Sequence, residues 1–420
     1  MENINKILKE QINLVKPENE VVDDIKKISK EFCNNLRNKL RKYKIKADIF
    51  IGGSLAKGTL VKTSDNLYDV DVFVRFDKKY SENKIQELLK KVLIKGINRV
   101  HGSRDYYQFK VNNIIIEIIP VLKIKNPKEA RNVTDLSYFH VNYILKKIKK
   151  YKKLSDEIII AKAFTHSQNC YGAESYIKGF SGYAIELLII YYGSFLKFIK
   201  EIASSNKKII IDESKSYKKK KDVLMELNEA KILSPIILVD PTFKERNALS
   251  GLSDEAFEKF KKACQDFLKN PSKDFFKNKN ILDEMKRYKD LRIVSVRTNK
   301  QKGDIAGTKS KKFMNFFNFE LKKEFLLKKA EFEYKEDENN AYFYLVIEKK
   351  PEEIIKGPPI TAVENLAGFK RAHADAFIKN QIAYARAYHN LSFVEFLKRF
   401  LEKNDKVIKD MSIEEIKLIK

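Results

Sequence analysis

Residues 68–76 (YDVDVFVRF) constrain the fold more than any other part of this 420-residue chain. Valines take the central apolar positions of the segment, and Asp69 and Asp71 alternate with them. Because successive side chains of a strand point to opposite faces, this alternation predicts a strand with the valines in a core and both carboxylates on the other face. Two carboxylates side by side repel each other unless water or a cation screens them. The segment therefore predicts either a solvated sheet face or a cation site.

The neighbouring segments predict a small mixed sheet around this strand. In chain order they are an amphipathic helix at 19–44, a strand at 47–51, a glycine turn at 52–54, the strand at 68–76, a helix at 84–93, and strands at 106–111 and 113–124 joined around Asn112-Asn113. This order predicts a sheet with helices on one face, ending near residue 125.

The rest of the chain predicts further domains. Its expected elements are helices through 136–200 and at 254–269, a linker near 278–286, strands at 291–297, 330–334 and 341–348 around a helix at 311–329, and two helical segments beyond Gly357-Pro358-Pro359. We therefore expect a multidomain chain that combines α/β and α+β parts. It has an α/β head at 1–140, a mostly helical neck at 141–280, and an α+β body with a helical tail at 281–420.

The charge of the chain indicates a polyanionic partner. Lys and Arg number 84 against 57 Asp and Glu, a formal net charge of +27. Such a field attracts polyanions, of which nucleic acid is the commonest, although an AT-rich genome that favours Lys is an alternative explanation. Basic runs at 146–153 and 215–221, the second in an expected loop or hairpin, are candidate RNA-backbone contacts, together with Lys309, Lys311 and Lys312. We take Lys149, Lys219 and Lys311 as representatives of these candidates. The alternative for each is a surface position that contacts only solvent.

The cysteines and the apolar segments favour a cytoplasmic protein without a membrane span. Cys33, Cys170 and Cys264 lie far apart and form no CxxC pair, which argues against a disulfide framework or a zinc site. The first residues contain no apolar signal segment. The longest apolar stretch, 183–199, contains Glu186 and Lys197 and is too short to span a membrane. We expect this stretch to be a buried helix.

Asp69, Asp71 and Glu117 are the candidate metal ligands. Glu117 interrupts an apolar strand, where an ionised carboxylate is costly without a positive partner. Two carboxylates on one strand face, completed by a third, suit a site with two Mg²⁺ ions roughly 3.5 to 4 Å apart, which hold the attacking and leaving oxygens of a phosphoryl transfer. A solvated strand face and an edge position are the alternatives.

The glycine turn favours the phosphoryl-transfer hypothesis. At Gly52-Gly53-Ser54, backbone N–H groups and the Ser54 hydroxyl can approach a triphosphate closely, and Lys57 adds a positive charge nearby. Each feature alone is common. A strand, a glycine turn, an Asp-x-Asp strand and a later acidic strand in this order indicate phosphoryl-transfer chemistry.

These motifs resemble those of a known superfamily. G-G-S, D-V-D-V and E-I-I-P are similar to the catalytic core of the polymerase-β-type nucleotidyltransferases. Five later motifs resemble the archaeal, class I CCA-adding enzymes, and the resemblance covers residues 45–280, with I-K-G-P-P (355–359) as a weaker anchor beyond. They are S-Y-F-H (137–140), C-Y-G-A-E-S-Y-I-K-G-F-S-G-Y (170–183), E-L-L-I-I-Y-Y-G-S-F (186–195), V-D-P-x-x-x-x-R-N (239–247) and P-S-x-x-F-F (271–276).

The resemblance implies template-independent addition of CCA to the 3′ end of tRNA, with CTP, ATP and Mg²⁺. It implies that Asp69, Asp71 and Glu117 hold the metal ions, and that Glu117 also deprotonates or orients the 3′-hydroxyl of the RNA. The implied nucleotide-binding residues are Gly53, Ser54 and Lys57 at the triphosphate, Ser137, His140, Lys162 and Tyr171 at the phosphates and sugar, and Arg246 at the base. The head would catalyse, the neck would recognise the base, and the body and tail would bind tRNA.

Two departures from the family pattern qualify this resemblance. The third carboxylate is Glu117 where the family typically has Asp, and the extra methylene moves the oxygens by about 1.5 Å. Fourteen residues separate Ser54 from Asp69, a slightly long connection that predicts a bulge at 66–68.

Several alternatives remain open from the sequence. The chain could be a related nucleotidyltransferase with another product, such as poly(A) tails or a nucleotidylated small molecule, or a non-catalytic tRNA-binding protein. A homodimer is also open. Single residues have structural alternatives, namely surface or core packing for Lys162 and Tyr171, a structural role for His140, a helix-capping ion pair for Arg246, and core packing rather than RNA stacking for Phe316 and Phe317.

Overall fold

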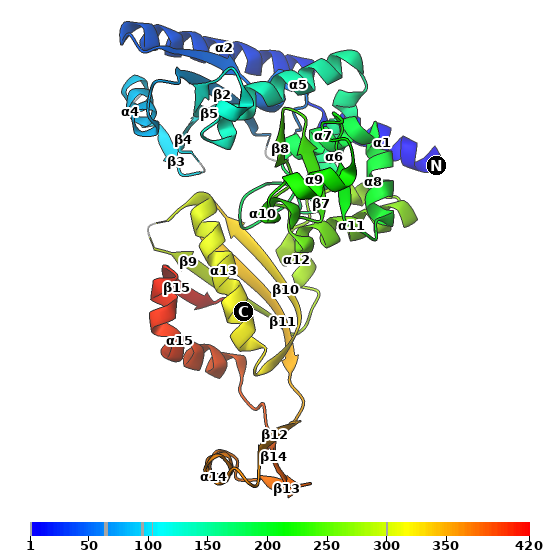
Figure 1. Cartoon of the computed structure of the whole chain (residues 1–420), viewed down its shortest axis with the longest axis vertical. Coiled ribbons are helices and arrows are strands. Elements are labelled where there is room, and N and C mark those ends of the chain that lie inside the picture. The colour runs from blue at the N-terminus through cyan, green and yellow to red at the C-terminus, as the bar shows by residue number, and fades with distance from the viewer. Residues whose placement is uncertain (1, 63–65, 94–95, 103, 300) are drawn as a thin grey trace. The chain divides into compact units, whose positions relative to one another are not determined.

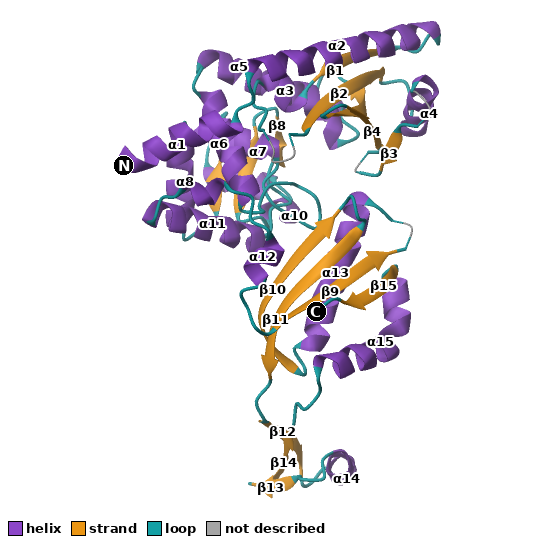
Figure 2. Cartoon of the chain, turned by 180° about the vertical axis from the view of Figure 1, so that it is seen from behind, coloured by secondary structure: helices purple, strands orange, loops and turns teal. Residues whose placement is uncertain are grey.

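The computed structural model describes residues 2–62, 66–93, 96–102, 104–299 and 301–420. The chain divides into two compact units, Met1–Lys279 and Asn280–Lys420 (Figure 1; Figure 2 gives the opposite view). All predicted metal-binding and nucleotide-binding residues lie in the first unit. Of the three representative RNA-binding lysines, only Lys311 lies in the second.

The first unit begins with the predicted mixed sheet. Its strands are β1 (Ala47–Ile51), β2 (Tyr68–Asp77), β5 (Ile114–Lys123), β4 (Tyr106–Val111) and β3 (Asn98–Val100), in this spatial order. β2 and β5 are parallel, and the other neighbours are antiparallel. The bulge predicted at 66–68 does not extend to Tyr68, because this residue already pairs with Ile114.

Helices cover one face of this sheet, as the sequence predicted. α2 (Asn19–Lys42) and α4 (Glu82–Val92) pack through apolar side chains against the valines of β2, which are 0% exposed (Figure 1). Amphipathic spacing explains both helices, because their buried residues recur at every third or fourth position and all of them except Ser29 are apolar. The opposite face of β2 and β5, which carries Asp69 and Asp71, is left for the site.

The remainder of the first unit is a helical bundle around an aromatic core. The helices packed on this core are α1 (Glu2–Val15), α5 (Ser137–Lys150), α6 (Leu154–Ser167), α7 (Gly182–Tyr192), α8 (Phe195–Ser204), α11 (Asp254–Lys269) and η3 (Lys273–Phe276). The short helices α3 (Gly53–Lys57), η1 (Pro127–Glu129) and η2 (Val133–Leu136) belong to the mixed-sheet part, whose core includes Leu55 and Leu136. The helices α9 (Lys220–Glu226) and α10 (Glu229–Ile232) pack in a small separate cluster. Phe164, Phe260 and Phe267 lie at its centre with no exposed surface. None of the three cysteines forms a disulfide, and all are buried.

The structure adds detail to two sequence predictions for this region. A three-stranded sheet, β6 (Ile209–Ile211), β7 (Ile236–Asp240) and β8 (Phe243–Asn247), interrupts the predicted helical neck. Strands of three to five residues are too short to show a clear period. The second basic run is not only loop, because Lys219 is the N-cap of α9 and its backbone N–H donates to the Asp222 side chain.

None of the described helices is by itself long and apolar enough to cross a membrane. The pair α7 and α8, bent by 95°, meets that length and composition only when the two are taken together.

The second unit contains two antiparallel sheets. The larger consists of β10 (Phe325–Lys335), β11 (Asn340–Lys349), β9 (Leu291–Thr298) and β15 (Ile413–Leu418), and the smaller of β12 (Glu353–Pro359), β14 (Ile382–Ala387) and β13 (Phe377–Lys379). α13 (Gly303–Leu321) and α15 (Phe393–Asp410) share one core with the larger sheet, whereas α12 (Ile281–Met285) packs in a separate cluster with β9 and β11. α14 (Val363–Ala372) accompanies the smaller sheet.

Three predictions for the second unit need correction. The helix predicted at 311–329 ends at Leu321, and Phe325 begins β10, where Phe325 and Leu327 point into the core at strand spacing. The linker predicted at 278–286 contains α12, whose Met285 is buried. The tail holds α14 and α15 as predicted, but also the small sheet and β15. Phe317 is fully buried, so core packing was the correct alternative for this residue.

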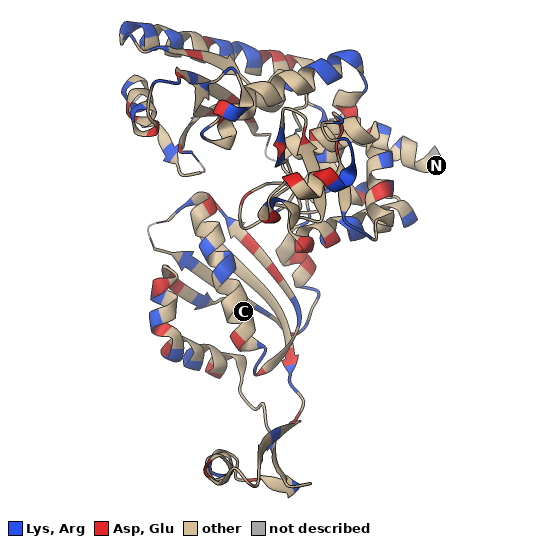
Figure 3. Ribbon diagram, viewed as in Figure 1, with Lys and Arg blue, Asp and Glu red and all other residues tan. Residues whose placement is uncertain are grey.

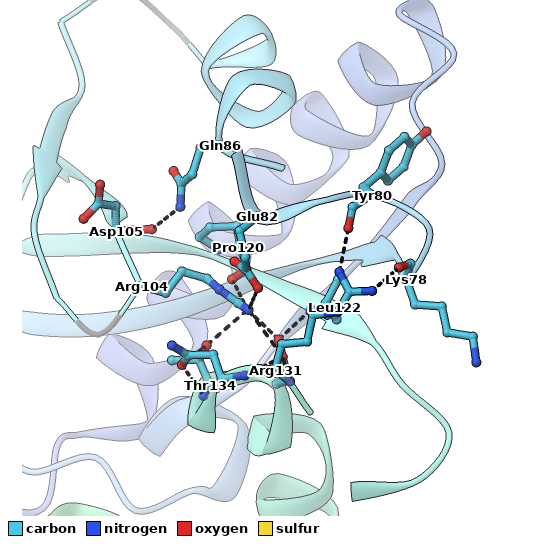
Figure 4. A network of polar contacts seen from close by, with 12 residues as sticks. Lys78, Tyr80, Glu82, Gln86, Arg104, Asp105, Pro120, Leu122, Arg131 and Thr134 are labelled. Carbon is cyan, nitrogen blue, oxygen red and sulfur yellow. Dashed lines mark hydrogen bonds and ion pairs between the residues drawn. The ribbon is translucent and has the colours of Figure 1, made fainter. Parts of the chain in front are cut away.

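A buried ion pair sets the position of α5. Arg104 Nη1 lies 2.5 Å from Asp135 Oδ1, and its Nη2 lies 2.6 Å from Glu82 Oε1 (Figure 4). The Leu122 N–H also donates to Asp135 Oδ1 at 2.7 Å. The Arg104 side chain is 3% exposed and that of Asp135 0%. Because Asp135 belongs to η2, which leads directly into α5, this network fixes the start of the helix that carries His140.

We predict that Asp135→Ala lowers the free energy of unfolding by about 3 to 5 kcal/mol, because it leaves the Arg104 charge buried without its main partner. Thermal or denaturant unfolding measures the change. The matched control is Glu87→Ala, which removes an exposed ion pair with Lys84 on α4 and should change stability little. Equal effects of the two variants would contradict a central role for the buried pair.

Candidate active site

Asp69, Asp71 and Glu117 occupy one face of the parallel pair β2–β5. Asp71 is the register partner of Glu117, and Asp69 precedes Asp71 by two residues. Register partners on neighbouring strands direct their side chains to the same face. Asp69 is exposed, and Asp71 and Glu117 are half-buried, whereas the valines of β2 are inaccessible on the other face. The alternation in residues 68–76 predicted this division of faces correctly.

These carboxylates have the chemistry of a divalent-cation site. Burial raises the pKa of Asp71 above its ordinary value, although Lys57 and Lys162 act in the opposite direction. Gln108 Nε2 donates a hydrogen bond of 2.9 Å to Glu117 Oε1. Hard cations such as Mg²⁺ prefer carboxylate oxygens, so the donor set fits such an ion. Among the described residues, no group of three or more His, Cys, Asp or Glu side chains has the arrangement of a formed metal site.

The glycine turn is fixed directly against the carboxylates. The Gly52 N–H donates to the backbone carbonyl of Asp71 at 2.9 Å. Gly53 begins α3 with φ of 59°, a left-handed conformation that favours glycine. A Cβ added to Gly53 would lie 1.6 Å from Asp71 Oδ2, which is far closer than two unbonded atoms can approach. The turn therefore requires glycine for both its conformation and its contact with Asp71.

A cavity of about 730 Å³ opens beside the turn. Four of the predicted site residues line it, namely Ser54, Asp69, Lys162 and Tyr171. His166, which the sequence analysis did not single out, also lines it. Small-molecule sites commonly have volumes of roughly 300 to 1,000 Å³, so the cavity has the size of a nucleotide site.

Two predicted phosphate-binding lysines converge on one buried carboxylate. Lys57 Nζ lies 2.7 Å from Glu186 Oε2, and Lys162 Nζ lies 2.8 Å from Glu186 Oε1. Lys162 also donates to Thr59 Oγ1 at 3.0 Å. The Glu186 side chain is 0% exposed. Burial acts to raise the pKa of Glu186, but Lys162 and Lys57 hold it below its ordinary value. This arrangement places two ammonium groups beside Asp71, which contributes to the charge balance of Lys57.

His140 and Arg246 meet at a second buried carboxylate, Asp240. His140 Nε2 lies 3.0 Å from Asp240 Oδ2, and Arg246 Nη1 lies 2.8 Å from the same oxygen. Burial lowers the pKa of His140 even though Asp240 acts to raise it, so the neutral imidazole is favoured. Arg246 lies on β8 rather than at a helix end, which rules out the helix-capping alternative. Ser137 is half-buried and is the first residue of α5, the helix that carries His140.

The predicted RNA-binding lysines belong to other elements of the fold. Lys149 is exposed near the C-terminal end of α5, and Lys219 is exposed at the start of α9. Lys311 is half-buried on α13 of the second unit, with its ammonium group 5.3 Å from the Phe332 ring. Figure 3 shows basic residues along α2, at the end of α5 and before α9, so positive charge is spread over several surfaces.

Comparison with known proteins identifies the family. Residues 156–277 match the model described as "tRNA nucleotidyltransferase, second domain". A CCA-adding enzyme of Nanoarchaeum equitans is 35% identical, with 79% of this chain and 81% of that enzyme covered. A CCA-adding enzyme of Methanocaldococcus jannaschii is 30% identical, with 93% and 89% covered. The chain belongs to the archaeal-type CCA-adding enzymes.

Two solved structures show a similar fold. A cytoplasmic RNA terminal U-transferase has a TM-score of 0.50 and 14% identity, and covers 67% of this chain and 100% of its own. The Cid1 poly(U) polymerase also has a TM-score of 0.50 and 14% identity, and covers 65% and 98%. These likenesses support the polymerase-β-type nucleotidyltransferase fold that the motifs predicted.

Two carboxylates of this CCA-adding enzyme, Glu186 and Asp240, had no role predicted from the sequence. Glu186 lies in the apolar stretch that we treated only as a buried helix, and Asp240 ends the apolar strand β7 within the V-D-P motif. Both segments nevertheless contained a signal that could have identified these carboxylates. An isolated carboxylate in an apolar segment requires a positive partner, which is the reasoning that selected Glu117.

Gly53→Ala and Gly58→Ala should separate the contact with Asp71 from backbone strain. Both glycines have a left-handed φ, 59° and 66°, but a Cβ at Gly58 has no atom within 4 Å. Each variant should lose about 1 to 2 kcal/mol of stability. Only Gly53→Ala displaces the Asp71 carboxylate, so its nucleotide incorporation should fall at least about 100-fold, equivalent to 2.7 kcal/mol. Steady-state incorporation and thermal unfolding are the measurements, and comparable activity of the two variants would refute the contact's importance.

Proposed function

We propose that this protein adds CCA to the 3′ end of tRNA by template-independent nucleotidyl transfer from CTP and ATP. Its family membership supports this activity. The observation that carries the proposal is the single cavity lined by Ser54 of the glycine turn, Asp69 of the carboxylate pair, and Lys162 and Tyr171 of the neck. Each contributes a group that a nucleoside triphosphate needs, and together they form one site.

The transfer exchanges one phosphorus–oxygen bond for another. The 3′-hydroxyl oxygen of the RNA bonds to the α-phosphorus of the nucleotide, and the bond from that phosphorus to pyrophosphate breaks. Glu117 accepts or orients the hydroxyl proton, with Gln108 holding its Oε1 in place. Asp69, Asp71 and Glu117 would hold Mg²⁺, which supplies positive charge to the attacking and leaving oxygens when bound.

The remaining site residues hold the nucleotide. The turn at Gly53 and Ser54 approaches the triphosphate, and Lys57 and Lys162 offset its negative charge. Ser137, His140 and Tyr171 contact the sugar and phosphates, and Arg246 hydrogen-bonds to the edge of the base. We assign catalysis to residues 1–140, base recognition to 141–280, and binding of tRNA to 281–420 together with basic surfaces that include Lys149, Lys219 and Lys311.

Incubation with tRNA lacking its 3′ CCA, labelled CTP and ATP, and Mg²⁺ tests the activity. We expect addition of C, C and A in order. Asp69→Asn and Asp71→Asn should each slow addition at least about 100-fold, because metal-assisted charge stabilisation contributes several kcal/mol. Asp77→Asn, at the end of the same strand, is the matched control and should retain activity.

Three outcomes would reject this proposal. Absence of extension by the unaltered protein would favour a non-catalytic tRNA-binding role. Addition of C alone or A alone would favour a related enzyme with another product. Full extension by the Asp69 or Asp71 variant would remove the proposed metal site.

Arg246→Ala should lower the preference for correct nucleotides more than the rate of phosphoryl transfer. The guanidinium lies beside Asp240 rather than among the metal-binding carboxylates, and each base-reading hydrogen bond to a charged group contributes about 1.5 to 3 kcal/mol. Ratios of kcat/KM for CTP and UTP on tRNA lacking CCA give the discrimination. An unchanged ratio would refute the role of Arg246 at the base.

A further inference from the structure

Asp240 is the most heavily hydrogen-bonded carboxylate at the neck end of the site. It ends β7 and is 0% exposed. Tyr183 donates to Oδ1 at 3.0 Å, and the Thr242 N–H and hydroxyl donate to the same oxygen at 2.9 and 2.7 Å. Oδ2 contacts His140 and Arg246 at 3.0 and 2.8 Å. Since a carboxylate accepts about four hydrogen bonds, both oxygens are fully used.

The side chains around Asp240 also contact one another. The rings of His140 and Tyr183 stack with centroids 4.0 Å apart and planes 22° apart. Arg246 Cζ lies 6.0 Å from the centre of the Tyr183 ring. These three side chains come from α5, α7 and β8, so one carboxylate joins three separate elements. Tyr183 completes the group through both its ring and its hydroxyl.

The exposed fraction of the side chain decreases from Arg246 to His140 to Asp240. The Arg246 side chain is 24% exposed, that of His140 13%, and that of Asp240 0%. A ligand therefore reaches Arg246 without reaching Asp240. A flexible arginine loses rotamer entropy when it is fixed, and a planar guanidinium reads a base edge only in a fixed orientation. The hydrogen bond to Asp240 supplies that orientation before the nucleotide binds.

We propose that Asp240, supported by Tyr183, is the positioning residue that orients Arg246 for nucleotide selection. This inference rests on the proposed function, because it requires Arg246 to face the base. Asp240 acts on selection without touching substrate. Although burial acts to raise it, the pKa of Asp240 is held far below its ordinary value by the hydrogen bond with His140 and by the charge of Arg246, so the anion persists.

Glu186 provides an internal contrast on the same helix. Tyr183 and Glu186 are three residues apart on α7, which places them on one side of the helix. Tyr183 contacts Asp240, whereas Glu186 contacts Lys57 and Lys162. One turn of α7 thus supports two parts of the proposed site. Tyr183 contacts Asp240 near the residue assigned to the base, and Glu186 contacts the two lysines assigned to the phosphates. Variants at the two positions should therefore change different properties.

The test compares Tyr183→Phe, Asp240→Asn and Glu186→Gln on tRNA lacking CCA. Two quantities are measured, the ratio of kcat/KM for CTP over UTP and the inhibition constant of inorganic pyrophosphate. Tyr183→Phe and Asp240→Asn should lower the ratio about tenfold or more, as expected for a lost hydrogen bond to a charged group, and should leave pyrophosphate inhibition within about twofold. Glu186→Gln should weaken pyrophosphate inhibition and leave the ratio unchanged.

Two controls separate positioning from folding. Tyr192→Phe makes the same chemical change on α7, where the ring packs near Phe198 instead of Asp240, and should change neither quantity. Tyr183→Phe keeps the ring stack on His140, so it tests the hydroxyl even if Asp240→Asn does not fold. Tyr183→Phe should add little to Arg246→Ala, because both act on the same recognition step.

The outcomes distinguish this inference from the proposed function. If the unaltered protein extends tRNA but Tyr183→Phe leaves the CTP-to-UTP ratio unchanged, the positioning role of Asp240 is overturned and the proposed function stands. An equal loss of rate with both nucleotides would likewise reduce Asp240 to a structural role. If the unaltered protein extends no tRNA, both fail.

Discussion

The buried charge group of Glu186, Lys57 and Lys162 is the interaction on which the site depends. Lys57 follows the glycine turn of the mixed sheet, Lys162 lies on α6, and Glu186 lies on α7. A buried charge that loses its partner costs several kcal/mol, so the three elements must keep their relative positions. The same ammonium groups lie near Asp71, and thereby offset part of the repulsion between the carboxylates of β2 and β5. Lys162, from the helical part of the first unit, therefore contributes to the charge balance of the carboxylates on the sheet.

Local pattern was enough to predict which face of β2 carries the carboxylates. Alternation placed Asp69 and Asp71 opposite the buried valines, and helical spacing predicted α2. The partners of Glu186 could not be predicted in this way, because Lys57 and Glu186 are 129 residues apart and no periodicity reports such a pairing. Asp240 has the same property, since His140 precedes it by 100 residues. From the sequence only Glu117 was recognised as a carboxylate that needs a partner, and the fold was required to reveal Glu186 and Asp240 together with their partners.

The second unit shows a different limit of sequence reasoning. Residues 311–329 contain enough aromatic and basic side chains to look continuously helical, yet the last residues pair with β11. Pairing with the next strand in the antiparallel β10–β11 hairpin overrode local helix propensity there. The small sheet was hidden by Pro358 and Pro359, which usually exclude a strand. β12 is an edge strand of its sheet, where a proline costs no hydrogen bond to a neighbour on the open side.

The three buried cysteines can report local opening of the hydrophobic cores in which they lie. Cys33 belongs to the core beneath the mixed sheet, and Cys170 and Cys264 belong to the aromatic core of the helical bundle. Burial raises the pKa of Cys33 to about 11 and that of Cys264 well above its ordinary value, and only the thiolate attacks thiol reagents readily. In the folded state Cys33 and Cys264 are therefore protected twice, by exclusion of the reagent and by protonation. The rate at which each cysteine becomes alkylated accordingly measures how often its own core opens, so the sheet and the bundle can be followed separately without adding a label.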